Sequence, residues 1–417
     1  MKKFWMIALC MLLAACMLVV GTGCARVSAS ELSAGYTRNV EGAAEMDGDF
    51  TASAADFAFA LFRETLDEEK EKQLISPLSA MLCLALVANG ADGETLAQME
   101  EAFGMDIGSL NESLYAYANS LYRGENCKTE LANSIWFRDA DFLTVREEFL
   151  QTNANWYGAE VYKAPFDAST QKAINDWVRE NTDGMIDSIL DEPPNATTIM
   201  YLINTLVFDA KWQTKYEKND IRDRSFTNAD GSRTTVDMMY SDESVLLQGE
   251  DFLGFAKNYE GNAYSFVGLL PDDKDTDIFK FAASLTGEGW LAMWNSRRGA
   301  PVDVGIPEFS YDSYSSLVEA LKAMGMEDMF SAHGADFSKL GSVDGENIFC
   351  SSVEQKTFID VSRNGTRAAA VTWATVECTS AAPMESYTVI LDRPFVYAIV
   401  DNATGLPLFV GVVGSMK

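Results

Sequence analysis

The stretch GTRAAAVTWATVECTSAAP, from Gly365 to Pro383, decides the fold of this chain. Every second residue is small or β-branched, whereas the interleaved positions carry the charged and bulky side chains. The small set comprises Thr366, Ala368, Ala370, Thr372, Ala374 and Val376. A period of two with one small face is typical of a strand that packs on a crowded core. An ordinary strand already in a sheet is the simpler alternative, and Ala-rich runs also form helices.

The residues that follow decide between these alternatives. The segment PFVYAIVDNATGLPLFVGVV, Pro394 to Val413, combines an apolar strand, an acid, a Thr-Gly turn and Leu-Phe-x-Gly. It resembles the C-terminal signature of the serpins, and Gly365-Thr366-x-Ala368-Ala369-Ala370 resembles their hinge. The two motifs occur in the family's order at near-family spacing. We therefore identify the chain as a member of the serpin family.

Further segments after residue 50 resemble the same family. The resemblances are Leu74–Ser79 with Ala88–Ala91 (second helix), Asn133–Phe137 (sheet strand), Ile174–Val178 with Thr182–Ile186 (helix and turn before the sheet), Asn204–Trp212 (strand beneath the insertion site), Ile306–Phe309, Met329–Phe330 and Ala335–Ser338. The resemblance implies an α+β chain with the serpin fold: three β-sheets, about nine helices and an exposed reactive-centre loop.

The N-terminus indicates export. Lys2 and Lys3 precede an apolar run from Phe4 to Val20, and small residues then lead to Cys24. This order is typical of a signal peptide, and about 17 apolar residues are marginal for a membrane span. Cys24 resembles the acylated cysteine of a bacterial lipoprotein. Cys16 follows a closer match to the lipoprotein box, but cleavage there would leave an apolar tail, so Cys24 is favoured.

Three regions follow from this composition. We expect a lipoprotein signal peptide over residues 1–24, a flexible tether over 25–50 and one serpin domain over 51–417. The tether prediction rests on a segment rich in Ala, Ser, Gly and Glu without a sustained apolar period. No second linker interrupts the remaining length, which favours one large domain.

Charge excludes several classes of partner. The net charge is −30 and the positive side chains are scattered, so the chain should repel nucleic acid and anionic headgroups. Activation by a polyanion is disfavoured for the same reason. The cysteines beyond the signal, Cys24, Cys83, Cys127, Cys350 and Cys378, match no zinc pattern. Cys83 is expected in the core, whereas Cys378 falls in the expected loop, where its thiol could be oxidised.

The sequence also argues against an enzyme. The single histidine, His333, stands beside Gly334 in an expected surface turn, and a Ser-His or Cys-His site would have to use it. The chain contains no Gly-x-Ser-x-Gly elbow, no phosphate-binding glycine loop and no His-Glu-x-x-His helix. These absences argue against a hydrolase, a kinase or a metalloenzyme. The resemblance implies a protease inhibitor, and we expect no catalytic residue, no cofactor and no metal.

The resemblance implies a trap for a serine protease. The protease cleaves the loop, forms an acyl-enzyme and is carried away as the freed segment becomes a new strand of the main sheet. The hinge residues would be Gly365, Thr366, Ala368, Ala369, Ala370 and Thr372. The region that opens the sheet would comprise Ser76, Ser79, Asn204, Trp212 and Gln355. Small hinge side chains without proline or inward charge favour an inhibitory member over a non-inhibitory one.

Several positions depart from the family pattern. Arg363, Asn364 and Arg367 stand where acids are common, Trp373 is bulky on the outward face, and Gln355 replaces a frequent histidine. The interval from Gly365 to Phe395 is about four residues longer than in a typical inhibitor such as antitrypsin. Counting from the hinge places the reactive bond at Thr379-Ser380. Counting back from Phe395 moves it towards Pro383-Met384, and the forward count is favoured because insertion length fixes where the protease ends.

Uncharged residues at either bond indicate elastase-like or subtilisin-like targets and disfavour trypsin-like enzymes. Two alternatives stay open: a non-inhibitory serpin-fold binding protein, and a cross-class inhibitor of cysteine proteases. We expect a secreted, cell-surface lipoprotein of the bacterial extracellular space, held to the membrane by its N-terminal lipid anchor. Its expected partner is the target protease, and the expected state is a monomer that binds no nucleic acid.

Overall fold

The protein is described by a computed structural model, which defines residues 29–42, 44–140, 143–194, 198–344, 347–366 and 386–417. Over these ranges the chain forms nine α-helices and three sheets, which confirms the α+β arrangement expected from the resemblance. The helices are α2 (Phe50–Thr65), α3 (Pro77–Ala88), α4 (Gly93–Phe103), α5 (Ile107–Ser120), α6 (Glu147–Trp156), α7 (Ala168–Asn181), α8 (Ile278–Ser284), α9 (Gly287–Asn295) and α10 (Val318–Ala323). Two short 3-10 turns are η1 (Lys218–Asp220) and η2 (Asp328–Phe330).

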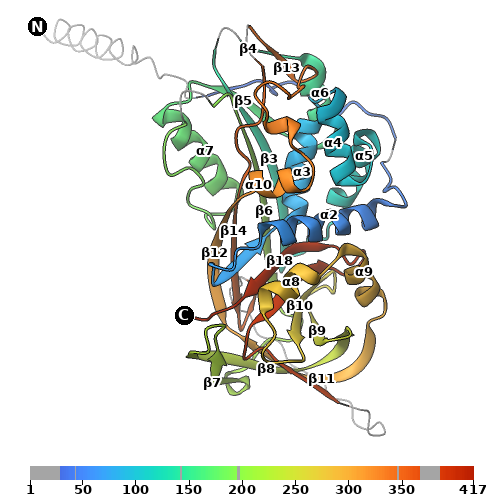
Figure 1. The fold of residues 1–417 in the computed structure, drawn as a ribbon, viewed down its shortest axis with the longest axis vertical. Helices are drawn as coiled ribbons and strands as arrows, with labels where there is room; N and C mark the ends of the chain where they lie inside the picture. Colours follow the sequence, from blue (N-terminus) through green and yellow to red (C-terminus); the bar gives the residue numbers. More distant parts are fainter. Residues whose placement is uncertain (1–28, 43, 141–142, 195–197, 345–346, 367–385) are drawn as a thin grey trace, which may run out of the picture.

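The main sheet has seven strands in the order β1-β5-β3-β6-β15-β14-β12. They are β1 (Ser30–Glu31), β5 (Glu160–Ala164), β3 (Cys127–Arg138), β6 (Met200–Lys211), β15 (Gly365–Thr366), β14 (Glu354–Ser362) and β12 (Phe309–Ser316). Helix α7 covers one face of this sheet, and α3 to α6 lie on the other (Figure 1). Between α7 and the sheet, side chains such as Trp177 of α7, Trp136 and Ile203 form a separate small core.

The second sheet has nine strands and carries the C-terminus. Its order is β16-β11-β8-β9-β10-β17-β18-β2, with β7 on β8. The strands are β16 (Tyr387–Ile390), β11 (Arg298–Pro307), β8 (Arg233–Gln248), β9 (Phe252–Asn258), β10 (Tyr264–Pro271), β17 (Phe395–Asp401), β18 (Pro407–Val413), β2 (Lys72–Ile75) and β7 (Ile221–Thr227). A third, two-stranded sheet joins β4 (Leu143–Val145) to β13 (Gly341–Val343). All residues of β17 and β18 are buried, as the apolar runs of both strands predict; only Asp401, at the end of β17, is charged.

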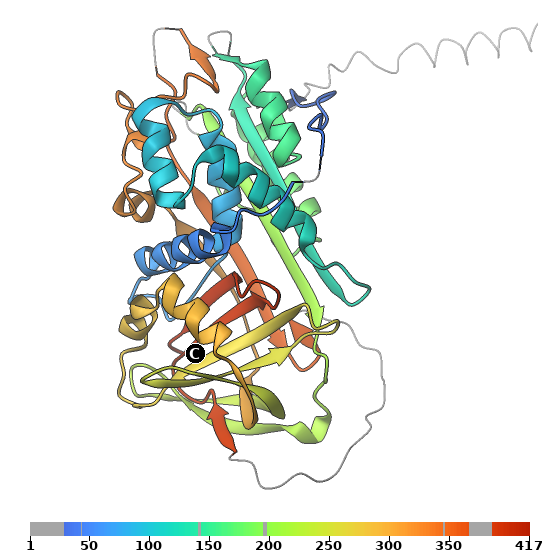
Figure 2. The same cartoon turned by 90° about the vertical axis from the view of Figure 1, so that its right-hand side faces the viewer.

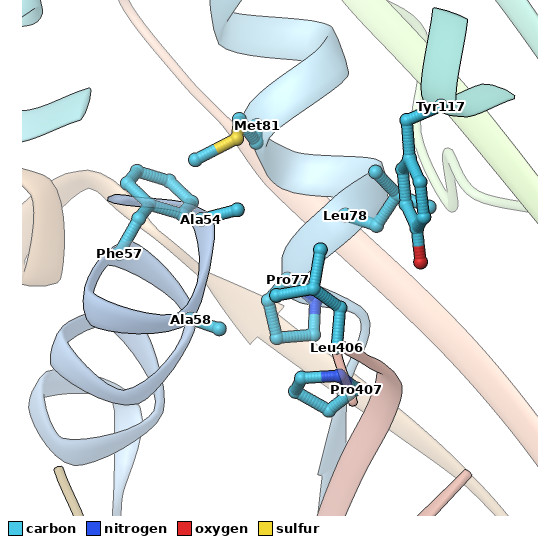
Figure 3. A pocket seen from close by; sticks show the side chains of 9 residues that line it. All are labelled: Ala54, Phe57, Ala58, Pro77, Leu78, Met81, Tyr117, Leu406 and Pro407. Carbon is cyan, nitrogen blue, oxygen red and sulfur yellow. The ribbon is translucent and has the colours of Figure 1, made fainter. Parts of the chain in front are cut away.

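Helix α3 illustrates how the sequence builds the interior. Pro77 occupies the first turn, and the Ser76 hydroxyl accepts a hydrogen bond from the Ser79 amide, a favourable N-terminal cap. Every residue of the helix is buried, which its nearly uniform apolar sequence requires. Figure 3 shows the apolar gap between α3, α2 and Leu406-Pro407. Its volume of about 10 Å³ is at the lower limit for holding one water molecule, so it is a packing defect rather than a ligand site.

The segment before α2 differs from the expected flexible tether. Ser30 and Glu31 extend the main sheet beside Lys163 and Tyr162, and the Leu32 amide donates to the Val161 carbonyl at 2.6 Å.

Arg38 fixes the next part of this segment. Its guanidinium lies 3.8 Å from the ring centre of Tyr115 and 4.9 Å from that of Trp156. It also donates to the Asn155 carbonyl at 2.6 Å. We call residues 29–49 the N-terminal strap, because their described part lies against the domain. The signal segment and Cys24 lie outside the described residues. None of the helices in the described part of the chain has the length and apolar character that a membrane span needs.

Candidate functional site

The candidate functional site lies between β6 and β14 of the main sheet, at β15. The two residues of β15 lie between β6 and β14, with Thr366 opposite Ala210 on one side and Val361 on the other. Within the described ranges, β6 otherwise pairs only with β3, and β14 only with β12. The hinge therefore already occupies the first position of a strand between β6 and β14.

Gly365 makes this position possible. Its φ of +149° lies in a region that favours glycine. A Cβ atom there would stand 2.1 Å from the Ala210 carbonyl oxygen and 2.7 Å from the Lys211 Cα. The close approach of two backbones, rather than flexibility alone, requires glycine at the start of β15.

The main sheet meets the second sheet near the hinge end of β6 (Figure 2). Beneath the hinge, the buried rings of Trp212 and Tyr259 form what we call the aromatic floor. The rings of Trp212 and Tyr259 are stacked, with centroids 4.5 Å apart and planes 9° apart, and both are buried. Trp212 Nε1 donates to the Ser362 carbonyl at 2.8 Å. The hydroxyl oxygens of Tyr259 and Thr366 lie 2.5 Å apart. The Trp212 side chain thus contacts the last residue of β14, and Tyr259 contacts β15 itself.

The substitution of Arg363 for a common acid is compensated. Its guanidinium donates two hydrogen bonds to the Glu308 carboxylate, at 2.9 and 3.0 Å, and its amide donates a third at 2.9 Å. The Glu308 hydrogen bonds raise the pKa of Arg363. Planar Arg–carboxylate pairing is geometrically specific, so the turn that leads into β15 has a fixed partner in Glu308, the residue between β11 and β12.

Four of the predicted sheet-opening residues lie close together behind β6 and β14. Gln355 Oε1 accepts from the Ser76 amide, and Gln355 Nε2 donates to the Ser76 carbonyl, both at 2.9 Å. The Ser79 hydroxyl donates to Asn204 Oδ1, and Asn204 Nδ2 donates to Asn133 Oδ1. The Gln355 amide thus satisfies both backbone groups of Ser76. Trp212, the fifth predicted residue, lies apart at the hinge end of β6.

The segment after α7 lies across the sheet, as the sequence suggested. Asn175 Oδ1 accepts from the Ile189 and Leu190 amides at 2.9 and 3.0 Å, holding the segment to α7. Lys356 Nζ on β14 donates to the Ser188 carbonyl at 3.1 Å. A new strand beside β14 would have to pass beneath this segment.

Several predicted residues fall outside the described residues. They are Ala368, Ala369, Ala370 and Thr372 of the hinge, Thr379 and Ser380 of the reactive bond, Met384, Cys378 and Cys24. His333 lies in an exposed turn and Cys83 is buried, as expected. Burial raises the pKa of Cys83, Cys127 and Cys350 to about 12, which makes these thiols unreactive. No cluster of three His, Cys, Asp or Glu side chains that could hold a metal occurs in the described ranges.

Sequence reasoning missed Tyr259, Glu308 as the partner of Arg363, and the charges near Trp212. Tyr259 and Thr366 are 107 residues apart, and Arg363 and Glu308 are 55 apart. No local pattern connects such positions.

Comparisons with known proteins agree with this geometry. A family model described as "Serpin (serine protease inhibitor)" matches residues 52–415. Leukocyte elastase inhibitor A of Mus musculus is 31% identical over 379 residues, covering 86% of this chain and 97% of that protein. Leukocyte elastase inhibitor of Bos taurus is 32% identical over 391 residues, covering 88% and 99%. The crystal structure of native tengpin, a thermophilic serpin, is 42% identical with a TM-score of 0.88, covering 94% of this chain and all of that one.

Proposed function

Because this chain belongs to the serpin family of protease inhibitors, we propose that it is a suicide-substrate inhibitor of serine proteases. The loop after Thr366 is attacked as a substrate, and the acyl-enzyme forms. The freed segment then inserts between β6 and β14, which deforms the attached protease before it can hydrolyse the ester.

The observation that carries this proposal is β15 itself. Thr366 is already paired on both sides, antiparallel to β6 and to β14. A longer strand needs only to continue the same register. That continuation would place Ala368 opposite Ile359, Ala370 opposite Thr357 and Thr372 opposite Gln355.

The residues that would receive this strand are suited to a small inner face. Gln355, Thr357, Ile359 and Val361 are buried, whereas the alternating residues of β14 are only partly buried. Opposite residues in a sheet share a face, so Thr366, Ala368, Ala370 and Thr372 would face the core. Arg367 and Ala369 would face α7 and the segment after it. The small side chains therefore belong to the side where space is limited.

The energetics also support a trap. From Gly365 to Thr379 the chain spans 14 steps, so full insertion moves the protease roughly 50 Å at about 3.4 Å per residue. A dozen new ladder hydrogen bonds at ~1 kcal/mol each would release on the order of ten kcal/mol. Strand insertion must be faster than deacylation of the acyl-enzyme, and typical enzymes turn over at about 1–1000 s⁻¹.

The expected targets are elastase-like or subtilisin-like proteases. Thr379 and its neighbours carry no Lys or Arg, and the similarity to leukocyte elastase inhibitors supports this choice. The bond near Met384 remains the second candidate and would also suit elastase or chymotrypsin.

The test is an adduct assay on the protein without residues 1–24, which keeps the N-terminal strap. It is mixed with elastase, subtilisin, chymotrypsin, trypsin and the cysteine protease papain, then analysed on a denaturing gel. We expect a denaturant-resistant band at the summed mass of this protein and the protease. Mass spectrometry should show that the released C-terminal peptide begins at Ser380. Cleavage without an adduct by every protease would favour the non-inhibitory alternative, and an adduct with papain alone would favour the cross-class one.

A substitution checks the reactive bond. Thr379→Arg should confer inhibition of trypsin, because a basic residue would then precede the cleaved bond. The control is Met384→Arg. Trypsin inhibition by Met384→Arg and not by Thr379→Arg would place the reactive bond directly after Met384, near the position reached by counting back from Phe395.

Membrane anchoring belongs to the same proposal. Acylation of Cys24 would hold the inhibitor at the outer surface of a bacterial cell as a monomer. Mass spectrometry of the N-terminal peptide should show a lipid on Cys24, and Cys24→Ser should release the protein. A lipid on Cys16, or full release of the unaltered chain, would argue against it.

A further inference from the structure

A buried ion pair lies behind the aromatic floor of the hinge. Lys257 on β9 and Glu243 on β8 join Nζ to Oε1 at 2.7 Å, with side chains only 2% and 14% exposed. The Ser241 hydroxyl donates to the same Glu243 oxygen at 2.7 Å and lies 3.2 Å from the Tyr216 hydroxyl. Nothing in the sequence motifs or in the proposed trap accounts for these charges.

The Lys257 ammonium also contacts two aromatic rings. Its Nζ lies 4.6 Å from the ring centre of Tyr216 and 5.5 Å from that of Trp212. These rings meet edge to face, with centroids 6.4 Å apart and planes at 89°. A cation over ring faces is held most strongly where water is excluded, as it is at this depth.

The residues that carry both rings also hold the turn that leads into the hinge, through their backbone amides. The Tyr216 amide donates to the Arg363 carbonyl at 3.3 Å, and the Trp212 amide to the Asn364 carbonyl at 3.2 Å. Trp212 also stacks on Tyr259, whose hydroxyl contacts Thr366. A continuous set of contacts therefore leads from the ammonium to the first residue of the inserting strand.

Stability alone does not explain a charge pair at this place. Moving two charges out of water costs several kcal/mol per ion, and apolar replacements of such pairs are often neutral or stabilising. What an apolar side chain cannot supply is directional attraction to two ring faces and to a carboxylate at once. The arrangement instead fixes where the rings lie.

We propose that Lys257 is a positioning residue for strand insertion. Held by Glu243, its ammonium fixes the rings of Tyr216 and Trp212 so that Tyr259 meets the Thr366 hydroxyl as the strand starts. Without this ammonium the rings of the aromatic floor are less firmly positioned and insertion slows, so more of the inhibitor is released in cleaved form without trapping the protease. The inference deepens the proposed function and rests on insertion between β6 and β14.

The experiment measures insertion without a protease. A synthetic peptide of residues 366–379 is incubated with the intact inhibitor, and its incorporation is followed by native gel and native mass spectrometry. Lys257→Met should slow incorporation between about threefold and thirtyfold, the upper value corresponding to a desolvated cation–π contact of ~2 kcal/mol. Lys257→Arg, which keeps charge and ring contact, should restore most of the rate.

Matched variants separate positioning from a general loss of structure. Lys322→Met breaks an ion pair with Glu319 on α10, outside the hinge contacts, and should leave the rate unchanged. Tyr216→Phe keeps the ring and should also insert at the wild-type rate. Tyr216→Leu removes the ring while leaving Lys257 and Glu243 in place, so it should slow insertion even if Lys257→Met fails to fold.

The outcomes distinguish this inference from the proposed function. Wild-type rates in Lys257→Met, or equal slowing in Lys322→Met, would overturn the role of Lys257 while leaving adduct formation intact. Slowed incorporation in Lys257→Met, together with no adduct from the wild-type protein, would support the role of Lys257 and reject inhibition. Failure of the wild-type protein to incorporate the peptide would overturn the inference.

Discussion

Gly365 sets the geometry of the hinge. Its Cβ position would overlap the Ala210 carbonyl of β6, so the residue is required by the close approach of two backbones. The hinge composition that identifies the family in the sequence is thus tied to one measurable contact in the folded state.

Gly365→Ala should displace β15 and lower the unfolding free energy by about 1–3 kcal/mol, the range typical of a strained backbone position. The measurement is the midpoint of urea unfolding, with exchange of the Thr366 amide as a local probe. Gly158 also has a positive φ, of 55°, but has open space around its Cβ position, so Gly158→Ala is the control. Equal losses in both variants would show that φ alone, and not the contact with Ala210, matters.

Arg363 shows how a departure from a family pattern is absorbed. The sequence raised a doubt because an acid is common at this position, but Glu308 supplies the opposite charge. Gln355 is a similar case. Its side-chain amide hydrogen-bonds to both the backbone amide and the backbone carbonyl of Ser76, so these groups are paired although the frequent histidine is absent.

At the scale of elements, the neighbouring strands β14 and β6 determine which side chains of an inserting strand would face the core and which would face outward. Buried residues alternate along β14, and β15 fixes the register. Successive residues of the loop should therefore differ sharply in their tolerance of charge.

If the chain inhibits as proposed, Ala368→Glu should convert it from an inhibitor into a substrate, because a buried carboxylate opposite Ile359 would stall insertion. Ala369→Glu is the matched control, since the same side chain one residue later would face outward. The measurement is the number of inhibitor molecules consumed per protease inactivated, expected to rise at least about tenfold for Ala368→Glu, equivalent to ~1.4 kcal/mol in partitioning. Equal effects of the two substitutions would contradict the register.

At the scale of the whole molecule, the N-terminal strap joins distant parts of the domain. It extends the edge of the main sheet at β5 and contacts α5 and α6 through Arg38 and Asp47. If Cys24 is lipidated, only residues 25–28 separate the lipid from the described start of the strap, so the domain would lie close to the membrane surface.

Removal of residues 1–49 should lower the thermal unfolding midpoint by several degrees relative to removal of residues 1–24. The deletion exposes the β5 edge and the rings of Tyr115 and Trp156, and each 1 kcal/mol corresponds to about 2–4 °C in a domain of a few hundred residues. Arg38→Ala in the longer protein should reproduce part of the loss. An unchanged midpoint in both would mean that the docked strap contributes nothing to stability.

The sequence determined the family, the elements and the small face of the hinge, because these depend on local periodicity and on motifs within a few residues. The apolar runs of α3, β17 and β18 could only be buried, and the Thr-Gly turn between the last two strands could only reverse the chain. Even the absence of enzyme motifs was a local property.

Only the tertiary structure decided which distant residues contact one another. The Glu308–Arg363 pair, the Tyr259–Thr366 contact, the Lys257 ion pair and the docking of Arg38 join residues 14 to 118 positions apart. Composition predicted a flexible tether over residues 25–50, because the segment is too polar to fold alone. The edge of β5 and two aromatic rings supply contacts for residues of the N-terminal strap. Such contacts arise from how sheets meet in space, and no local pattern in the chain encodes them.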